Sequence, residues 1–236
     1  MGRLAVGSTP RLIIFDCDGT LVDSQHMIVS AMTTALAQNG ISPLPRGRVL
    51  DGVGLSLPEA MRRLLPEADD GLVKGLAQSY REAFLELRSQ PGHQEPLYDG
   101  AREALQRLTN RDDLLLGIAT GKARRGVNAL VEREGFHGYF ATIQTADTAP
   151  SKPHPAMIEQ ALIEVGVERS AAVMVGDTTF DIEMARNASV AGVGVGWGYH
   201  PGDALRKAGA HALVDDFDEL LDEIERLFGL AARAGQ

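Results

Sequence analysis

Short apolar runs with the composition of β-strands alternate with helical patterns over most of this 236-residue chain. Continuous apolar runs are typical of strands in a parallel sheet that is covered on both faces. Six runs are expected to be strands, and they occupy residues 11–15, 114–119, 141–145, 171–175, 191–195 and 210–214. Helices are expected at residues 101–108, 123–134, 155–165, 179–188 and 218–228. This alternation predicts βαβ units and an α/β fold with a doubly wound parallel sheet.

One long segment, residues 23–97, interrupts the alternation. It has helical periodicity at residues 24–38, 57–65 and 72–87 and contains no convincing strand. Ser24 is expected to cap the first of these helices, and the turn-rich residues 90–100 mark the return to the sheet. We therefore predict an α/β core domain made of residues 1–22 and 98–236. A helical cap domain, residues 23–97, is inserted after the first strand.

Two aspartates, Asp16 and Asp18, come directly after the first predicted strand, in the run Phe-Asp-Cys-Asp-Gly-Thr. In an open α/β sheet, ligands bind outside the carboxyl ends of the strands. Two carboxylates with this spacing can attack a phosphorus atom, exchange a proton with a leaving group and hold a hard cation. Taken alone, such a pair is about as often a solvated turn or a helix cap as a catalytic site. The residues at the other strand ends are therefore needed to distinguish these interpretations.

Polar groups that suit the same reaction follow three further predicted strands. Thr120 and Gly121 offer a hydroxyl and an amide to phosphate oxygens, and Lys152 supplies a positive charge from the Ser-Lys-Pro loop. Asp177 and Asp181, in the run Gly-Asp-Thr-Thr-Phe-Asp, add two carboxylates for Mg²⁺. Because phosphoryl transfer mainly requires positioning and charge neutralisation, this set fits it well.

The order of these motifs, Asp-x-Asp-Gly-Thr, then Thr, then Lys-Pro, then Gly-Asp-x-x-x-Asp, resembles the haloacid dehalogenase superfamily over nearly the whole chain. The helical insert, the run Leu-Tyr-Asp-Gly at residues 97–100 and the run Val-Gly-Trp-Gly-Tyr at residues 195–199 resemble the phosphoglycolate phosphatase-like group. That group usually has Pro where Asp99 stands and often an apolar residue where Cys17 stands. In many relatives Asn follows the threonine of the second motif, which here reads Thr-Gly-Lys. These departures touch substrate details rather than the chemistry.

The resemblance implies a Rossmann-like core and a Mg²⁺-dependent phosphatase that hydrolyses a small, phosphoglycolate-like phosphomonoester through an aspartyl-phosphate. Asp16 would be the nucleophile, and Asp18 would act first as the acid and then as the base. The implied catalytic set is Asp16, Asp18, Thr120 and Lys152. The implied phosphate-binding set is Gly19, Thr20, Thr120, Gly121 and Lys152. The implied metal ligands are Asp16, Asp18 (through its carbonyl), Asp177 and Asp181, the last either directly or through water.

Three other functions stay open. A phosphomutase of the same superfamily would return the phosphoryl group to a bound sugar phosphate. A catalytically silent phosphate-binding or interaction protein would not need Asp18, and neither would a receiver-type signalling domain. The substrate body would be read by the helical cap. There, the glycine-containing loop 51–55 is expected to face the substrate, whereas Arg62, Arg63, Lys74 and Arg81 more often belong to solvated helix faces.

Composition limits the partners. The formal net charge of −9 argues against nucleic acid, which requires a concentrated basic surface. Cys17 is the single cysteine, so an intrachain disulfide cannot form and a reducing compartment is expected. Neither a signal peptide nor a run of roughly 20 apolar residues is found. We expect a cytoplasmic monomer or homodimer whose partner is a small phosphorylated molecule, with no membrane contact.

Overall fold

Six parallel strands form one sheet in the computed structural model, which describes residues 10–90 and 95–230. The strand order is β3-β2-β1-β4-β5-β6. The strands are β1 (Arg11–Phe15), β2 (Leu114–Thr120), β3 (Phe140–Thr145), β4 (Ala172–Gly176), β5 (Ala191–Val195) and β6 (Ala212–Val214). Because β1 lies between β2 and β4, the chain reverses its direction of winding at β1 and β4. The predicted doubly wound α/β fold is confirmed, and this reversal is where such sheets bind ligands.

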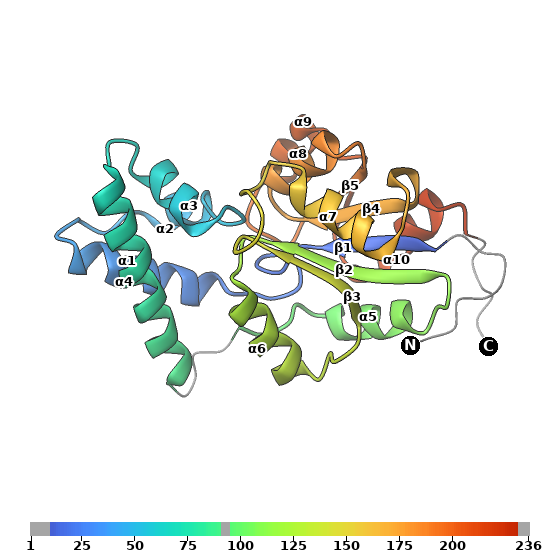
Figure 1. Ribbon diagram of the computed structural model, residues 1–236, viewed down its shortest axis with the longest axis horizontal. Helices are drawn as coiled ribbons and strands as arrows, with labels where there is room; N and C mark the ends of the chain where they lie inside the picture. The colour runs from blue at the N-terminus through green and yellow to red at the C-terminus, as the bar shows by residue number, and fades with distance from the viewer. Residues whose placement is uncertain (1–9, 91–94, 231–236) are drawn as a thin grey trace.

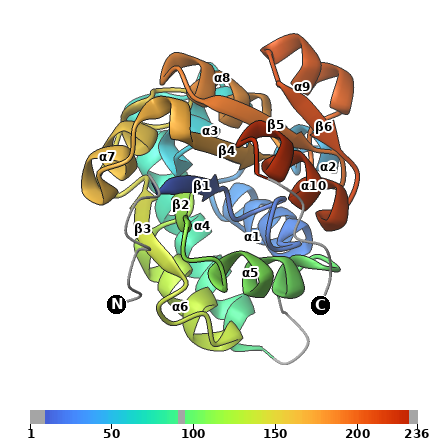
Figure 2. The same ribbon diagram turned by 90° about the vertical axis from the view of Figure 1, so that its right-hand side faces the viewer.

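Helices cover both faces of the sheet (Figure 2). One face carries α5 (Ala101–Thr109), α6 (Arg124–Glu134) and α10 (Phe217–Leu227), and the other carries α7 (Ala156–Val165), α8 (Thr179–Asn187) and α9 (Gly202–Ala208). Ile13 and Phe15 of β1 pack toward α5 and α10, whereas Leu12 and Ile14 pack toward α7 and α8. Since successive side chains of a strand point to opposite faces, burial on both faces requires the uninterrupted apolar run that the sequence shows.

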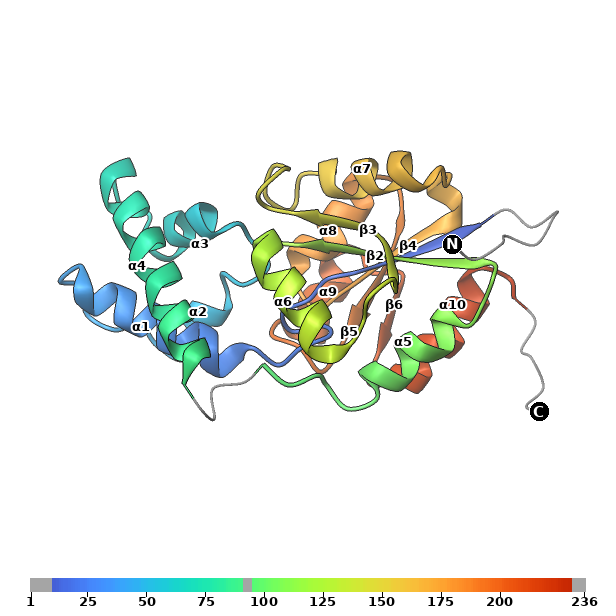
Figure 3. The same cartoon turned by 60° about the horizontal axis from the view of Figure 1, so that its bottom comes forward.

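Four helices form a group beyond the carboxyl ends of the strands (Figures 1 and 3). They are α1 (Gln25–Gln38), α2 (Arg46–Leu50), α3 (Leu57–Leu64) and α4 (Asp70–Ser89). Their apolar side chains make a cluster of their own, with Met32, Leu36, Met61 and Leu76 at its centre. We call residues 23–97 the insert. None of the helices in the described part of the chain is both long and apolar enough to cross a membrane.

Two antiparallel segments join the insert to the sheet. Val22 and Leu97 form a β-bridge, and the amide of Tyr98 donates to the carbonyl of Leu21 at 3.0 Å. Residues 91–94 of the predicted turn-rich exit lie outside the described residues. The division into a core of residues 1–22 and 98–236 and a cap of residues 23–97 stays our proposal.

Ser24 corrects one local expectation. It precedes α1, but its side chain makes no capping hydrogen bond. Instead, its hydroxyl lies 3.1 Å from the hydroxyl of Tyr199, and Tyr199 also packs against the apolar cluster of the insert. Ser24 therefore links the start of the insert to the loop that follows β5.

Candidate active site

The site begins where β1 and β4 end side by side. The amide of Asp16 donates to the carbonyl of Val175 at 2.9 Å, which continues the β1–β4 pairing by one residue. The Asp16 carboxylate is fully buried there. Cys17 points the other way, into an apolar cluster with Ile118 and Val127, where it is a small buried core residue. Burial also raises the pKa of the Cys17 thiol well above its usual range.

Three buried carboxylates meet at this point. Oxygen atoms of Asp16, Asp177 and Asp181 all lie within 4.8 Å of one another. Lys152 reaches the same place from the loop after β3, with its Nζ atom 2.8 Å from Asp16 Oδ1 and 2.6 Å from Asp181 Oδ1. The fold therefore brings together four of the residues that the sequence placed in the site.

The charges of this cluster do not balance. Burial raises the pKa of Asp16, an effect that Lys152 opposes. Burial, followed by the neighbouring charges of Asp181 and Asp16, raises the pKa of Asp177 well above its usual range. Desolvation works against the charge on Lys152, but the carboxylates of Asp16 and Asp181 outweigh it and raise the pKa of the lysine. One lysine thus faces three buried carboxylates, and a divalent cation would offset the excess negative charge.

The donor set itself fits such an ion. Although Asp16 forms an ion pair with Lys152, neither of its carboxylate oxygens has a hydrogen-bond partner among the described residues. Buried oxygens without partners are rare and costly in folded proteins. Here they lie next to other carboxylates, and oxygen ligands are those that hard cations prefer. The residues present therefore suit Mg²⁺.

Neighbouring groups fix the orientation of Asp177. The Thr20 hydroxyl donates to Asp177 Oδ1 and the Tyr199 amide donates to Oδ2, both at 2.9 Å. Gly19 has φ of +91° and passes so close that a Cβ atom would lie 2.2 Å from Asp177 Oδ2. Only glycine satisfies both conditions. Gly19 and Thr20, predicted to bind phosphate, thus contact a predicted metal ligand in this structure.

Asp181 is held by the start of α8. Its Oδ2 accepts hydrogen bonds from the amide and the hydroxyl of Thr178, at 3.0 and 2.6 Å, and its own amide donates back to the Thr178 hydroxyl. This is a capping box, in which the side chains of Thr178 and Asp181 each accept a hydrogen bond from the backbone amide of the other residue. Because Oδ1 already contacts Lys152, both oxygens of Asp181 have protein partners.

Thr120 and Gly121 lie at the end of β2, which flanks β1 on the side opposite to β4. They therefore lie across Asp16 from Asp177, which follows β4. Thr120 is 1% exposed, and its hydroxyl accepts a hydrogen bond from the Lys122 amide at 3.2 Å. A Cβ atom on Gly121 would lie 2.5 Å from the carbonyl oxygen of Leu55. The insert loop therefore approaches the predicted phosphate-binding loop as closely as backbone allows.

Sequence reasoning missed the surroundings of Asp18. Lys122 Nζ lies 2.7 Å from Asp18 Oδ1 and 2.7 Å from Glu95 Oε1, and Glu95 also contacts Arg88 at 2.5 Å. Lys122 and Arg88 lower the pKa of Glu95 although burial opposes this, and Asp18 and Glu95 raise the pKa of Lys122 against desolvation. The one available signal was the position of Lys122 directly after Gly121, since no motif surrounds Glu95.

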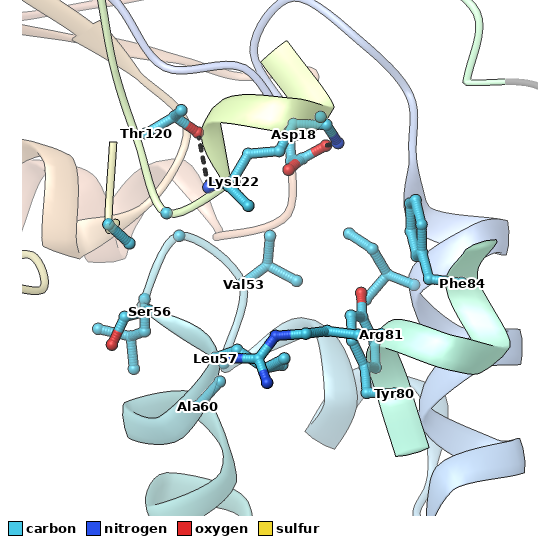
Figure 4. A pocket seen from close by; sticks show the side chains of 18 of the residues that line it. Asp18, Val53, Ser56, Leu57, Ala60, Tyr80, Arg81, Phe84, Thr120 and Lys122 are labelled. Carbon is cyan, nitrogen blue, oxygen red and sulfur yellow. Dashed lines mark hydrogen bonds and ion pairs between the residues drawn. The ribbon is translucent and has the colours of Figure 1, made fainter. Parts of the chain in front are cut away.

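A pocket of about 340 Å³ opens above Asp16 and Asp18, between the sheet and the insert (Figure 4). The loop of residues 52–55 lines it, as expected for the glycine-containing segment. Of the four basic residues considered in the insert, Arg81 borders the pocket, whereas Arg62 pairs with Glu59 and Asp70 on the surface.

Comparison with known proteins agrees with this geometry. The model of the haloacid dehalogenase-like hydrolase family matches residues 13–195. The chain belongs to this family. A relative named probable phosphatase IndB, from Dickeya dadantii, is 36% identical over 94% of this chain and 96% of its own length. A phosphoglycolate phosphatase from Pseudomonas savastanoi is 32% identical over 93% of this chain and 81% of its own.

The fold agrees as well. The crystal structure of a hydrolase from Pseudomonas syringae superposes with a TM-score of 0.81 and 28% identity, over 92% of this chain and 98% of that one. The resemblance noted from the motifs is thus confirmed as membership of the haloacid dehalogenase-like hydrolases, and so is the prediction that the chain is a hydrolase of the phosphatase type.

Proposed function

We propose that this protein is a Mg²⁺-dependent phosphatase that hydrolyses a small phosphomonoester through an aspartyl-phosphate on Asp16. The observation that carries the proposal is the buried Asp16 carboxylate, which has no hydrogen-bond partner among the described residues, sits beside Lys152 and lines the pocket. Relatives named phosphatase and phosphoglycolate phosphatase support the reaction class.

The reaction has two steps. A carboxylate oxygen of Asp16 attacks the phosphorus atom, and the bond from phosphorus to the ester oxygen breaks while Asp18 gives its proton to the departing alcohol. Water then attacks the phosphorus of the aspartyl-phosphate and loses a proton to Asp18, and the phosphorus–oxygen bond to Asp16 breaks. Inorganic phosphate leaves, and both aspartates return to their starting states.

The other residues keep the phosphoryl charge in place. In our proposal, Lys152, the Thr120 hydroxyl and nearby backbone amides hold phosphate oxygens. Asp16, the Asp18 carbonyl and Asp177 would hold Mg²⁺, which neutralises negative charge as the transition state forms. Thr20 orients Asp177, and Asp181 mainly positions Lys152, because its oxygens already have partners.

The substrate would be a small phosphorylated metabolite, and 2-phosphoglycolate is the reference compound because relatives carry its name. The cytoplasm and a monomeric or homodimeric state stay predictions.

The test measures phosphate release from p-nitrophenyl phosphate and a metabolite panel that includes 2-phosphoglycolate, with Mg²⁺ and with EDTA. Wild type should release phosphate only with Mg²⁺, and Asp16→Asn should release none. The matched control, Asp222→Asn on the exposed face of α10, should behave as wild type. Enzyme quenched in acid should carry covalent phosphate that hydroxylamine removes.

Two results would contradict the proposal. If folded, Mg²⁺-loaded wild type releases phosphate from no compound, the protein is not a hydrolase of these esters. If it converts a sugar phosphate into its positional isomer without releasing phosphate, the protein is a mutase.

A further inference from the structure

Most of the side chains that the insert contributes to the pocket are apolar, although Arg81 extends among them (Figure 4). Val53, Leu57, Ala60, Tyr80 and Phe84 face the cavity in Figure 4. The rings of Tyr80 and Phe84 lie next to each other, with centroids 5.8 Å apart. Among the lining residues that the insert contributes in the described part of the chain, none is Asp or Glu. A cationic substrate body would therefore find no counter-charge on this wall.

A second anionic group of the substrate, close to the phosphate, would also find few cations without a partner. Three cations at the site already have carboxylate partners. Lys152 pairs with Asp16 and Asp181, Lys122 is shared by Asp18 and Glu95, and Arg88 pairs with Glu95. Arg81 and Arg125 line the pocket but are exposed, and they form no ion pair with any described residue. A carboxylate one carbon from the phosphate ester, as in 2-phosphoglycolate, would therefore have to reach Arg81 or Arg125 to meet a cation that lacks a described carboxylate partner.

The cavity is also large for such a molecule. Its volume of about 340 Å³ lies within the range of about 300–1,000 Å³ that is usual for small-molecule sites. The phosphoryl group takes a minor share of this space, and a two-carbon body would leave most of the apolar wall in contact with water. Ligand sites of this size usually bury a ligand with a ring or larger skeleton against apolar and aromatic residues.

We propose that the substrate is the phosphate ester of an alcohol whose body is a flat, largely apolar ring, seated between the 53–57 loop and the Tyr80–Phe84 pair. This inference rests on the proposed phosphatase function and defines its substrate class. A flat ring matches the two aromatic side chains, which favour stacked or edge-to-face neighbours. Arg81, whose side chain extends from α4 toward Leu57 in Figure 4, would lie against the ring, on which guanidinium groups stack well.

The first experiment compares kcat/KM for three esters of primary alcohols: benzyl phosphate, ethyl phosphate and 2-phosphoglycolate. We expect benzyl phosphate to exceed both others by at least about tenfold, mainly through a lower KM, since apolar contacts to the body act in the bound ground state as well. Ethyl phosphate or 2-phosphoglycolate equalling benzyl phosphate would overturn the inference while leaving the phosphatase function intact.

Variants test the location of the ring. Ala60→Leu fills the cavity, and Phe84→Ala removes one ring of the wall. Each should lower the ratio of kcat/KM for benzyl phosphate over ethyl phosphate by about tenfold. Ala37→Leu, the same change on an exposed position of α1 outside the pocket, should keep the wild-type ratio. An unchanged ratio in folded Phe84→Ala would overturn the proposed location.

A binding measurement keeps the inference testable without turnover. Calorimetry on Mg²⁺-loaded wild type should give a Kd for benzylphosphonate at least about tenfold below that for methylphosphonate. The phosphonates cannot be hydrolysed, so absence of phosphatase activity would not affect this result. Equal affinities would show that the apolar wall does not select a ring.

Discussion

Among single residues, Lys122 has the strongest influence on the proposed acid–base group. Its ammonium group bridges Asp18 and Glu95, and its side chain is 9% exposed. The Lys122 ammonium also lies 5.5 Å from the centre of the Phe84 ring on α4. The same cation therefore lies beside three groups. These are Asp18, Glu95 where the insert returns to the sheet, and Phe84 of the pocket wall. We infer that Lys122 positions Asp18 for proton transfer.

Lys122→Met should lower kcat by about tenfold or more, which is part of the roughly 10²–10⁴-fold that a positioned acid contributes. KM should change little, because Lys122 has no free charge for the substrate. The same change should lower the free energy of unfolding by about 3 kcal/mol, since a buried ion pair loses one partner. Steady-state kinetics and urea titration measure the two effects.

The matched variant is Lys122→Met combined with Glu95→Gln. In Lys122→Met, Glu95 has lost one of its two cations but still pairs with Arg88. The added change removes this buried carboxylate, so part of the lost stability should return while kcat stays low. Recovery of kcat together with stability would show that Lys122 has only a structural role.

Gly19 allows a second residue-scale prediction. Gly19→Ala adds a methyl group that overlaps the Asp177 carboxylate and strains a left-handed backbone. Gly40→Ala is the control, because Gly40 has φ of +71° but no atom within 4 Å of the added Cβ. Both variants should lose about 1–2 kcal/mol of stability from the backbone alone.

The two glycine variants should differ in how much Mg²⁺ raises their Tm. Mg²⁺ should raise the Tm of Gly40→Ala as it does that of wild type, since an ion that binds only the folded state stabilises it. In Gly19→Ala this rise should shrink or vanish, because Asp177 has to move. A full Mg²⁺-dependent rise in Gly19→Ala would contradict the proposed role of Asp177. Differential scanning fluorimetry with Mg²⁺ or EDTA makes this comparison.

Among the secondary-structure elements, the start of α8 connects helix capping to the site. Thr178 caps the helix and also holds Asp181, which in turn contacts Lys152. At the start of α10, Asp216 accepts from the Glu219 amide at 2.8 Å and makes an N-cap whose hydrogen-bond partner is not a site residue. The two caps should contribute similar stability but differ in their effect on catalysis.

Thr178→Ala and Asp216→Ala should each lower the free energy of unfolding by about 1 kcal/mol, the usual value of an N-cap. Only Thr178→Ala should lower kcat/KM, by about 10- to 100-fold, as expected when an outer partner of a metal or phosphate ligand is removed. Urea titration and kinetics on both proteins test this. Equal activity of the two variants would show that Asp181 keeps its position without Thr178.

The elements also show what could be predicted from the sequence. Strand ends could be located because apolar runs stop abruptly at Asp16, Thr120 and Asp177, and the fold then fixes their proximity. Short α2 and α9 were not predicted, since five and seven residues hold too little periodicity to be recognised. The bridge from Lys122 to Glu95 joins residues 27 positions apart through tertiary structure alone, and no local pattern encodes it.

At the scale of the whole molecule, apolar side chains form separate clusters. Those on the two faces of the sheet include Leu105 and Met174, whereas that of the insert includes Leu76. Contacts between the insert and the sheet domain include polar ones, such as the hydrogen bond from the Ser56 amide to the Ser151 hydroxyl at 2.8 Å, and the close backbone approach of Leu55 to Gly121. Segments with their own apolar core often open as one cooperative unit, so we infer that the insert can open separately from the sheet.

Leu76→Ala and Leu105→Ala test this inference, because both leucines are 0% exposed and lie in different clusters. Each should lose about 2–5 kcal/mol locally. In hydrogen exchange followed by mass spectrometry, Leu76→Ala should speed exchange in α1, α3 and α4 while β1 and β4 keep their wild-type rates. Leu105→Ala should speed exchange in the sheet, since Leu105 lies in the apolar cluster that includes residues of β1, β2 and β4. Equal acceleration of sheet and insert in Leu76→Ala would mean that the chain unfolds as one unit, and the proposed cap domain would have to be abandoned.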